Sequence, residues 1–358
     1  MTGLMREYIG PLLDWYDADH RDLPWRRTRD PYRIWVSEIM LQQTRVQAVI
    51  PYYRRFLEEL PDTAHLAACP DDRLMKLWQG LGYYSRVRSM KKAAERIERD
   101  FGGTFPGTYE KILSLPGIGS YTAGAVSSIA FGLPEPAVDG NVLRVTARFA
   151  ADEENILAAS CKKRTEAGLR ALMREFPEGE MCGAFNQALM ELGAVVCVPK
   201  GEPLCGACPL AGGCEALRRG LTRVLPVREK QKKRKKETLT VLIIRRGDRT
   251  AVRRRPDRGL LADLYEYPNC PTHLSADEVL GYLRGLGLSP AEIAPLPSAS
   301  HLFTHVEWLM TGYSVRLPDG GTCPEDWVFA SPEELREKYA VPSAFSAYTK
   351  LLYKGGNR

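Results

Sequence analysis

LPGIGSYTAGAV, residues 115–126, contains a tight turn followed directly by helical periodicity. Pro116, Gly117 and Gly119 form the turn, because glycine adopts backbone conformations that other residues avoid. Such a turn lets backbone N–H groups approach a phosphate, and the following helix adds the positive end of its dipole. The dinucleotide-binding fingerprint is excluded, because Gly124 comes too late for its spacing and a helix precedes the turn. A plain turn between two helices remains the alternative.

Helical patterns lie on both sides of this turn and extend over about residues 1–222. With the helix expected at 108–114, the turn resembles a helix-hairpin-helix, a motif that grips DNA phosphates without reading the base sequence. Short breaks rich in Pro and Gly separate the helical segments, and we find no strand alternation. We therefore predict an all-α region whose segments include 34–60, 71–100, 120–132, 141–150 and 160–175.

The character of the sequence changes after about residue 236. TLTVLIIRR (238–246), RTAVRRR (249–255) and TGYSVRL (311–317) are short, β-branched and partly alternating, which is typical of strands. One helical pattern, at 276–286, interrupts them. We therefore predict that 237–358 forms an α+β domain.

Positive charge is concentrated between these two regions. The chain has a formal net charge of +6, while residues 223–236 contain eight basic residues and one acidic residue. That segment alone supplies +7, so the rest of the chain is nearly neutral. It is either a basic connector that contacts a polyanion or a solvated linker, and nucleic-acid binding must be argued from local motifs.

Four cysteines near the end of the helical region follow the spacing C-x7-C-x2-C-x5-C. They offer four thiolates to one loop without an intervening histidine, which fits a structural zinc or a cubane iron–sulfur cluster. Spacing alone leaves both open, together with an accidental run of buried or disulfide-forming cysteines. The four are Cys197, Cys205, Cys208 and Cys214.

The remaining five of the nine cysteines are scattered, which indicates a reducing compartment. Charged residues such as Arg6, Glu7 and Asp14 interrupt the apolar N-terminus, so it lacks the apolar run of a signal peptide or membrane span. We expect an intracellular, cytoplasmic protein without a membrane partner. Its length predicts two or three domains.

Glu38 lies within RIWVSEIMLQQTR (33–45), where its helical neighbours include Ile34 and Trp35. Burial among such residues would raise the pKa of this carboxyl group, which suits a general acid near neutral pH. The alternative is a glutamate on a narrow polar strip with Gln42. Asp139 precedes the helical pattern of 141–150, so we expect it to cap that helix. A carboxylate held by backbone donors stays ionised, which is compatible with catalysis.

The hairpin, the aspartate after it and the cysteine loop together resemble the endonuclease III superfamily of base-excision DNA glycosylases, over about residues 20–222. SEIMLQQT (37–44), LGYYSR (81–86) and VDGN (138–141) resemble the MutY adenine-DNA glycosylases, and this similarity spans almost the whole chain. It implies a helix-hairpin-helix core with a 4Fe-4S loop and a Nudix-like C-terminal domain. The implied parts are a cluster domain of 1–26 and 141–222, a six-helix barrel domain of 27–140, the linker 223–236 and a lesion-recognition domain of 237–358.

The resemblance implies a glycosylase that removes adenine mispaired with 8-oxoguanine or guanine from double-stranded DNA, in base-excision repair. Tyr121 stands where bifunctional relatives carry a Schiff-base lysine, so we expect no strand cleavage. Two carboxyl groups suit this reaction, one to protonate the leaving adenine and one to stabilise positive charge on the sugar. The match gives these roles to Glu38 and Asp139, and places Tyr121 and Asn141 beside them.

Other positions match family residues that hold the DNA. Because the target base must leave the helix, something must wedge the duplex, and Gln43 and Tyr83 match the wedge residues. Phe303, Thr304 and His305 match the lesion-recognition loop, which is usually Phe-Ser-His; a buried hairpin histidine is the alternative. The remaining matches are Arg26 in the adenine pocket, Thr44 and Leu81 beside the wedge, and Gly117 and Gly119 at a DNA phosphate.

Two other functions stay open at this point. An endonuclease III-like pyrimidine glycosylase/lyase is disfavoured by Tyr121, and a noncatalytic DNA-binding scaffold by the intact pair of carboxyl groups. The segment after Glu266 lacks the acidic cluster of Nudix hydrolases, so we expect a binding module there. The first cysteine interval is one residue longer than is usual in the family, and Gly201 and Pro203 suit a surface bulge that absorbs it. We expect a monomer.

Overall fold

The computed structural model describes residues 5–177, 179–229, 234–320 and 322–354. Two compact units are present, one made of Met1–Ala68 with Arg88–Lys230 and the other of Cys69–Val87 with Gln231–Arg358. Lys230, Lys232 and Lys233 of the expected basic connector lie outside the described residues. Within the described ranges, no helix combines the length and the apolar character needed to cross a membrane.

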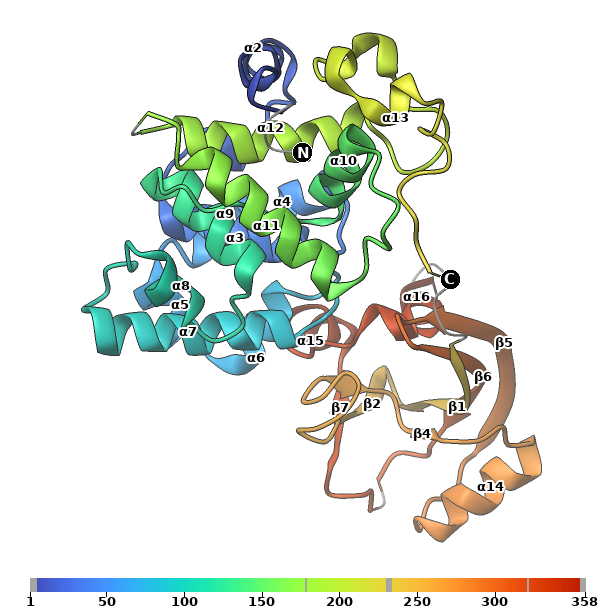
Figure 1. Cartoon of the computed structure of the whole chain (residues 1–358). Coiled ribbons are helices and arrows are strands. Elements are labelled where there is room, and N and C mark those ends of the chain that lie inside the picture. The colour runs from blue at the N-terminus through green and yellow to red at the C-terminus, as the bar shows by residue number, and fades with distance from the viewer. Residues whose placement is uncertain (1–4, 178, 230–233, 321, 355–358) are drawn as a thin grey trace. The chain divides into compact units, whose positions relative to one another are not determined.

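The first unit is helical, and its described residues contain no strand, as predicted (Figure 1). Two short 3-10 turns, Cys205–Ala207 and Ala211–Gly213, lie in the cysteine loop. The remaining elements are α2 (Ile9–Asp19), η1 (Pro24–Arg26), α3 (Pro31–Leu41), α4 (Val46–Glu59), α5 (Thr63–Ala68), α7 (Ser85–Phe101, which begins in the other unit), α8 (Tyr109–Leu113), α9 (Ser120–Phe131), α10 (Gly140–Ala150), α11 (Ala159–Met173), α12 (Met181–Val195) and α13 (Glu215–Arg218).

Two glycines let backbone segments of this unit approach each other closely. A Cβ atom on Gly124 of α9 would lie 2.2 Å from the carbonyl oxygen of Pro136. A Cβ atom on Gly193 of α12 would lie 2.6 Å from the Cβ atom of Asn141. Since real Cβ atoms do not come so close, both positions require glycine. The start of α10 is thereby held against α9 and α12, which positions Asp139.

The sequence prediction is wrong about two helical segments, because each of them is two separate helices. The segment 34–60 is divided into α3 and α4 around Gln43, and 71–100 is divided into α6 (Asp71–Leu77) and α7 before Ser85. Gln43 and Tyr83 adopt left-handed backbone conformations, with φ of 57° and 47°. Apolar spacing continues across both breaks, so periodicity alone did not reveal them.

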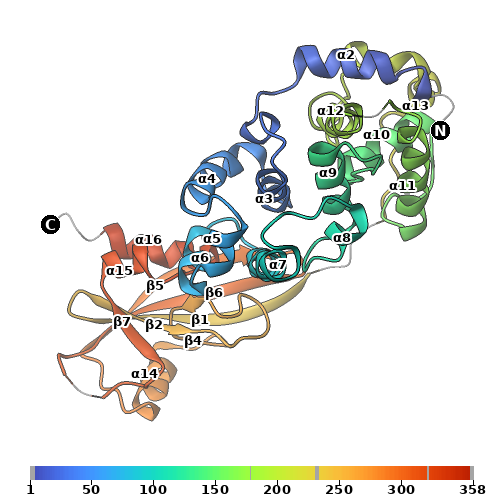
Figure 2. The ribbon, with the colours of Figure 1, turned by 90° about the vertical axis from the view of Figure 1, so that its left-hand side faces the viewer.

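The second unit contains a mixed sheet with the order β3-β2-β1-β6-β5, in which β1 and β6 are parallel. One sheet face packs on α15, α16 and the 3-10 turn Ser343–Phe345, and the opposite face packs on α14 (Figure 2). The α+β prediction is confirmed. The bounds are β1 (Lys235–Arg246), β2 (Arg249–Arg254), β3 (Tyr265–Glu266), β4 (Asn269–Cys270), α14 (Ala276–Gly285), β5 (Glu292–Leu302), β6 (Val306–Arg316), β7 (Trp327–Ala330), α15 (Pro332–Glu337) and α16 (Ser346–Lys354).

The segment Cys69–Val87 belongs to this second unit through side-chain bonds to backbone carbonyls. Lys76 Nζ donates to the carbonyl oxygens of Leu335 and Tyr339, at 2.9 and 3.2 Å. Gln79 Nε2 donates to the carbonyl oxygen of Val341 at 2.6 Å. Tyr83, which matches one of the two family wedge residues, and Leu81 are therefore carried by the same unit as the sheet.

Candidate active site

A pocket of about 610 Å³ in the first unit brings together all four predicted catalytic residues. Glu38 comes from the middle of α3, Tyr121 from the first turn of α9, and Asp139 from the residue before α10. This volume lies in the usual range for a small-molecule site. The pocket also contains Arg26, Gln43, Thr44, Gly119 and Asn141.

Glu38 is buried, with 6% of its surface exposed. Tyr121 donates its hydroxyl hydrogen to Glu38 Oε2 at 2.6 Å. Burial raises the pKa of Glu38 to about 7, although the Tyr121 hydrogen bond and Arg26 oppose this rise. The predicted burial and raised pKa are confirmed, and the interpretation as a polar-strip glutamate is wrong. A carboxyl group with this pKa is half protonated near neutral pH, which suits a general acid.

Asp139 caps α10, as predicted. Its Oδ1 accepts hydrogen bonds from the backbone N–H groups of Asn141 and Val142, both at 2.8 Å. Its Oδ2 accepts a third from Asn141 Nδ2 at 2.7 Å. Burial nevertheless raises the pKa of Asp139, against the lowering effect of these bonds. The capping donors therefore orient the carboxyl group and offset only part of its desolvation.

Arg144 connects this capping group to the cysteine loop. Its Nη2 donates to Asn141 Oδ1 at 2.8 Å and to the carbonyl oxygen of Gly193 at 2.6 Å. Its Nε donates to the carbonyl oxygen of Cys197 at 2.8 Å. One buried guanidinium group thus joins the start of α10, the end of α12 and the first cysteine.

Helix α12 supplies a wall of the pocket that the sequence analysis missed. Gln187, Met190 and Glu191 all line the pocket, and Met190 Sδ lies 3.2 Å from the Tyr121 hydroxyl. MCGAFNQALMELGAV is so uniformly apolar that its helical period is weak. Glu191, an acidic residue within this apolar run, was a signal that could have identified the pocket wall, by the same reasoning that identified Glu38.

The hairpin prediction is confirmed in its geometry. The turn between α8 and α9 has Gly117 at φ of 76°, and a Cβ atom there would lie 2.4 Å from Ser89 Cβ. Gly119 directly precedes α9, and nothing lies within 4 Å of where its Cβ would be. The open surface at Gly119 leaves room for a ligand at the start of α9.

The other predicted DNA-contact residues lie in the second unit. Leu81 is buried, whereas Tyr83 has 44% of its surface exposed, and the Tyr83 hydroxyl forms a hydrogen bond with Thr304 Oγ1. Phe303 packs edge-to-face on Trp308, with ring centroids 4.9 Å apart. His305 is exposed in the turn between β5 and β6, so the alternative of a buried hairpin histidine is wrong.

The four cysteines of the loop line one pocket together with Arg148. All four are free thiols, and Arg148 Nη1 lies 3.3 Å from Cys197 Sγ. No disulfide competes for them among the described residues, so the donor set fits an all-sulfur metal group. Gly201 is exposed with φ of 78°, as expected for a surface bulge, whereas Pro203 is buried.

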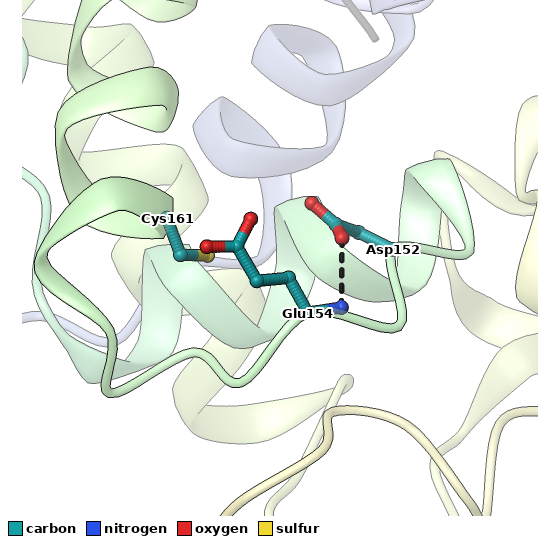
Figure 3. A group of neighbouring side chains, drawn as sticks. All are labelled: Asp152, Glu154 and Cys161. Carbon is teal, nitrogen blue, oxygen red and sulfur yellow. Dashed lines mark hydrogen bonds between the residues drawn. The ribbon is translucent and has the colours of Figure 1, made fainter.

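A separate group of possible metal ligands consists of Asp152 and Glu154, in the loop after α10, and Cys161, in the first turn of α11 (Figure 3). The backbone N–H of Glu154 donates to Asp152 Oδ1 at 3.0 Å. Arg164 forms ion pairs with both carboxylates. Since the Arg164 guanidinium group already pairs with both carboxylates, the group is interpreted as a structural ion-pair cluster.

In the Nudix-like region, Glu266 has structural partners. It is 3% exposed, Arg253 Nε donates to its Oε1 at 2.9 Å, and Arg255 pairs with its other oxygen. Both carboxylate oxygens are therefore engaged by arginine.

Residues 36–174 match the family model of HhH-GPD superfamily base excision DNA repair proteins, and residues 240–351 match that of the NUDIX domain. Adenine DNA glycosylase of Mus musculus is 34% identical and aligns with 86% of this chain and 70% of its own length. That of Buchnera aphidicola subsp. Baizongia pistaciae is 33% identical and aligns with 86% of this chain and 84% of its own length. The chain belongs to the adenine DNA glycosylase family.

The predicted resemblance to adenine DNA glycosylases is thereby confirmed. Among solved structures, a thermostable thymine-DNA glycosylase matches with a TM-score of 0.53 and 29% identity. The alignment covers 61% of this adenine DNA glycosylase family member and 98% of the solved chain. The predicted combination of a helix-hairpin-helix core with a Nudix-like domain is the fold of this chain.

Glu38→Gln is expected to flatten the pH dependence of stability. The pKa of Glu38 is about 7 in the folded chain, and an unfolded glutamate titrates near 4.3. Between these values only the folded state binds this proton, so the free energy of unfolding falls as the pH rises. Removing the group should reduce that fall by roughly 3 kcal/mol. Urea unfolding at pH 5 and pH 8 measures it.

The exposed Glu58 of α4 provides the control. Glu58→Gln should follow the unaltered chain at both pH values. An unchanged pH dependence in Glu38→Gln would contradict a raised pKa for the buried group.

Proposed function

We propose that this chain is a monofunctional DNA glycosylase that hydrolyses the N-glycosidic bond of adenine mispaired with 8-oxoguanine, and with guanine, in duplex DNA. The observation that carries the proposal is the pocket in which Glu38, with a pKa of about 7, lies beside Asp139. Its partner would be double-stranded DNA, bound by a monomer. The membership in the adenine DNA glycosylase family supports the choice of base.

The two carboxyl groups have different surroundings, which suits different roles. Glu38 is held by a hydroxyl donor and carries a proton near neutral pH, so it would protonate N7 of adenine and later help to activate water. Asp139 is held by three N–H donors and would stabilise the positive charge that develops on the sugar. Asn141 orders this group through one of those donors.

Tyr121 would lie beside the reacting sugar. Burial, with the charges of Glu38 and Asp139, raises the pKa of Tyr121, so its hydroxyl stays protonated and continues to donate to Glu38. A phenol cannot form the Schiff base of a lyase. The reaction would therefore end with base release and leave the strand intact.

The lesion would be read by the second unit. Thr304 and Tyr83 share a hydrogen bond, so the residue matching the lesion loop and the residue matching the wedge act as one group. 8-Oxoguanine differs from guanine by O8 and by a donor at N7, and polar side chains distinguish such edges. Gln43 and Thr44, which line the catalytic pocket of the first unit, would contribute to the wedge there.

The cysteine loop would hold a 4Fe-4S cluster through Cys197, Cys205, Cys208 and Cys214. Four free thiols lining one pocket support this assignment, and Arg148 beside them offsets negative charge. The cluster would supply a structural cross-link and a docking point for DNA. Base release would use the carboxyl groups alone.

We propose that the helical region divides as its hydrophobic packing suggests. One cluster of buried side chains joins Met5, Ile9, Leu12 and Tyr16 to residues between Val138 and Leu210. This packing supports a cluster domain of 1–26 and 141–222 and a barrel domain of 27–140. A phosphate of the DNA would lie at Gly117 and Gly119, where the turn is exposed.

The central test is single-turnover adenine release from a duplex with one A:8-oxoguanine pair. Glu38→Gln should slow release by about 10²- to 10⁴-fold while leaving duplex binding intact, because it removes only the proton donor. Equal rates would refute the role of Glu38. Borohydride trapping on a duplex with an oxidised pyrimidine would revive the lyase alternative, and binding without release would favour the scaffold.

Thr304→Val is expected to weaken lesion discrimination. It removes the hydroxyl that bonds to Tyr83 but preserves the shape of the side chain. The ratio of single-turnover rates for A:8-oxoguanine over A:G should fall by about fivefold, which corresponds to about 1 kcal/mol for one hydrogen bond. Ser300→Ala, which removes an exposed hydroxyl from β5, should leave the ratio unchanged. A ratio that is unchanged in Thr304→Val argues against the lesion role.

Cys208→Ser should lose most of the bound iron and melt at a lower temperature, because a cluster that needs four thiolates stabilises only the folded loop. Elemental analysis and a thermal melt measure both effects. Cys323→Ser, in the second unit, should keep its iron. Purified chain that is free of iron and zinc but fully active and stable would contradict a structural cluster.

A further inference from the structure

Glu191 of α12 holds two arginines at the wall of the catalytic pocket. Its Oε1 accepts from Arg21 Nε at 2.7 Å and from the Arg21 backbone N–H at 3.1 Å. Its Oε2 accepts from Arg21 Nη2 at 2.8 Å and from Arg26 Nη2 at 2.6 Å. The Glu191 side chain is fully buried, and all three residues line the pocket that contains Glu38.

The Glu191 carboxylate is ionised throughout the neutral pH range. Burial opposes ionisation, but the hydrogen bonds from Arg21 and Arg26 lower the pKa of Glu191 to about 2. Arg26 is also fixed by its own Nη1, which donates to the carbonyl oxygen of Arg21 at 2.9 Å. The Arg26 side chain is 10% exposed, so water offers its charge little screening.

Three charged or titratable groups from different elements act on Glu38. Tyr121 of α9 donates a hydrogen bond to it, Asp139 before α10 favours its protonated form, and Arg26 of η1 favours its ionised form. Arg26 is therefore the cation in this pocket that works against a proton on Glu38. The residue that neutralises the charge of Arg26 and fixes its position therefore determines how strongly Arg26 favours the ionised form of Glu38.

We propose that Glu191 is a positioning residue for the proposed reaction: it holds Arg21 and Arg26 against the pocket wall and so prevents a guanidinium group from pairing with Glu38. This inference rests on the proposed function. In the absence of Glu191, the guanidinium groups of Arg21 and Arg26 would lack their carboxylate partner, and Glu38 is the carboxyl group of the same pocket on which Arg26 already acts. Pairing with Glu38 would remove its proton and abolish its use as an acid.

The test is the pH profile of single-turnover adenine release from an A:8-oxoguanine duplex, between pH 5 and pH 9. In Glu191→Gln, the midpoint of the alkaline limb should move down by about one pH unit. The rate above the midpoint should then fall about tenfold, while the rate at pH 5 changes little. A midpoint that matches the unaltered chain overturns the inference.

Glu135→Gln is the matched control. It removes one carboxylate from an ion pair of the same unit, with Arg170 Nε at 2.8 Å, and Glu135 does not line the pocket. Its midpoint should equal that of the unaltered chain. A downward shift of the same size in this control would also overturn the inference, because the effect would then follow net charge alone.

A double-mutant cycle covers the case in which Glu191→Gln fails to fold. If Glu191 acts through Arg26, then Arg26→Gln and the double variant Arg26→Gln/Glu191→Gln should share one midpoint. Different midpoints overturn the proposed route. Absence of adenine release by the unaltered chain would instead overturn the proposed function, and with it the inference that rests on it.

Discussion

The desolvation of Glu38 is the constraint on which the rest of the site depends. A carboxyl group that loses its water retains its proton unless hydrogen bonds or cations compensate, and among the described residues the Tyr121 hydroxyl and Arg26 act in that direction. The surrounding helices maintain this balance: α9 supplies the hydroxyl, α12 restrains the cation through Glu191, and α10 holds Asp139 at its start. The pocket therefore keeps one acid protonated at a pH where free glutamate is ionised.

Close packing between helices gives the catalytic pocket its geometry. Gly124 and Gly193 admit backbone contacts that place the start of α10 against α9 and α12, and Arg144 then fills the junction. Because Arg144 also bonds to the carbonyl of Cys197, the shape of the cysteine loop and the orientation of Asn141 are mechanically linked. The Arg144 guanidinium group would therefore transmit a change in the shape of the cysteine loop to Asn141.

The sequence alone predicted the parts of the site that have a local signature. Glu38 stood out as an acid in an apolar helix, and Asp139 as a cap before a helix. Glu191 was missed because α12 is nearly uniformly apolar and its partners lie more than 160 residues earlier. The break at Gln43 was missed because a left-handed residue other than glycine leaves no compositional trace, whereas Gly80 and Gly82, both with positive φ, were an available signal for the break at Tyr83. Strand β5 contains Pro295 and Pro297, which are tolerated because it pairs only with β6 at the sheet edge.

The second unit is discontinuous in sequence, since Cys69–Val87 joins a domain that otherwise starts beyond residue 230. Lys76 and Gln79 find their acceptors on Leu335, Tyr339 and Val341, at the far end of the chain. During synthesis, the segment 69–87 is therefore made more than 240 residues before the backbone carbonyls that accept hydrogen bonds from the Lys76 ammonium and Gln79 amide groups.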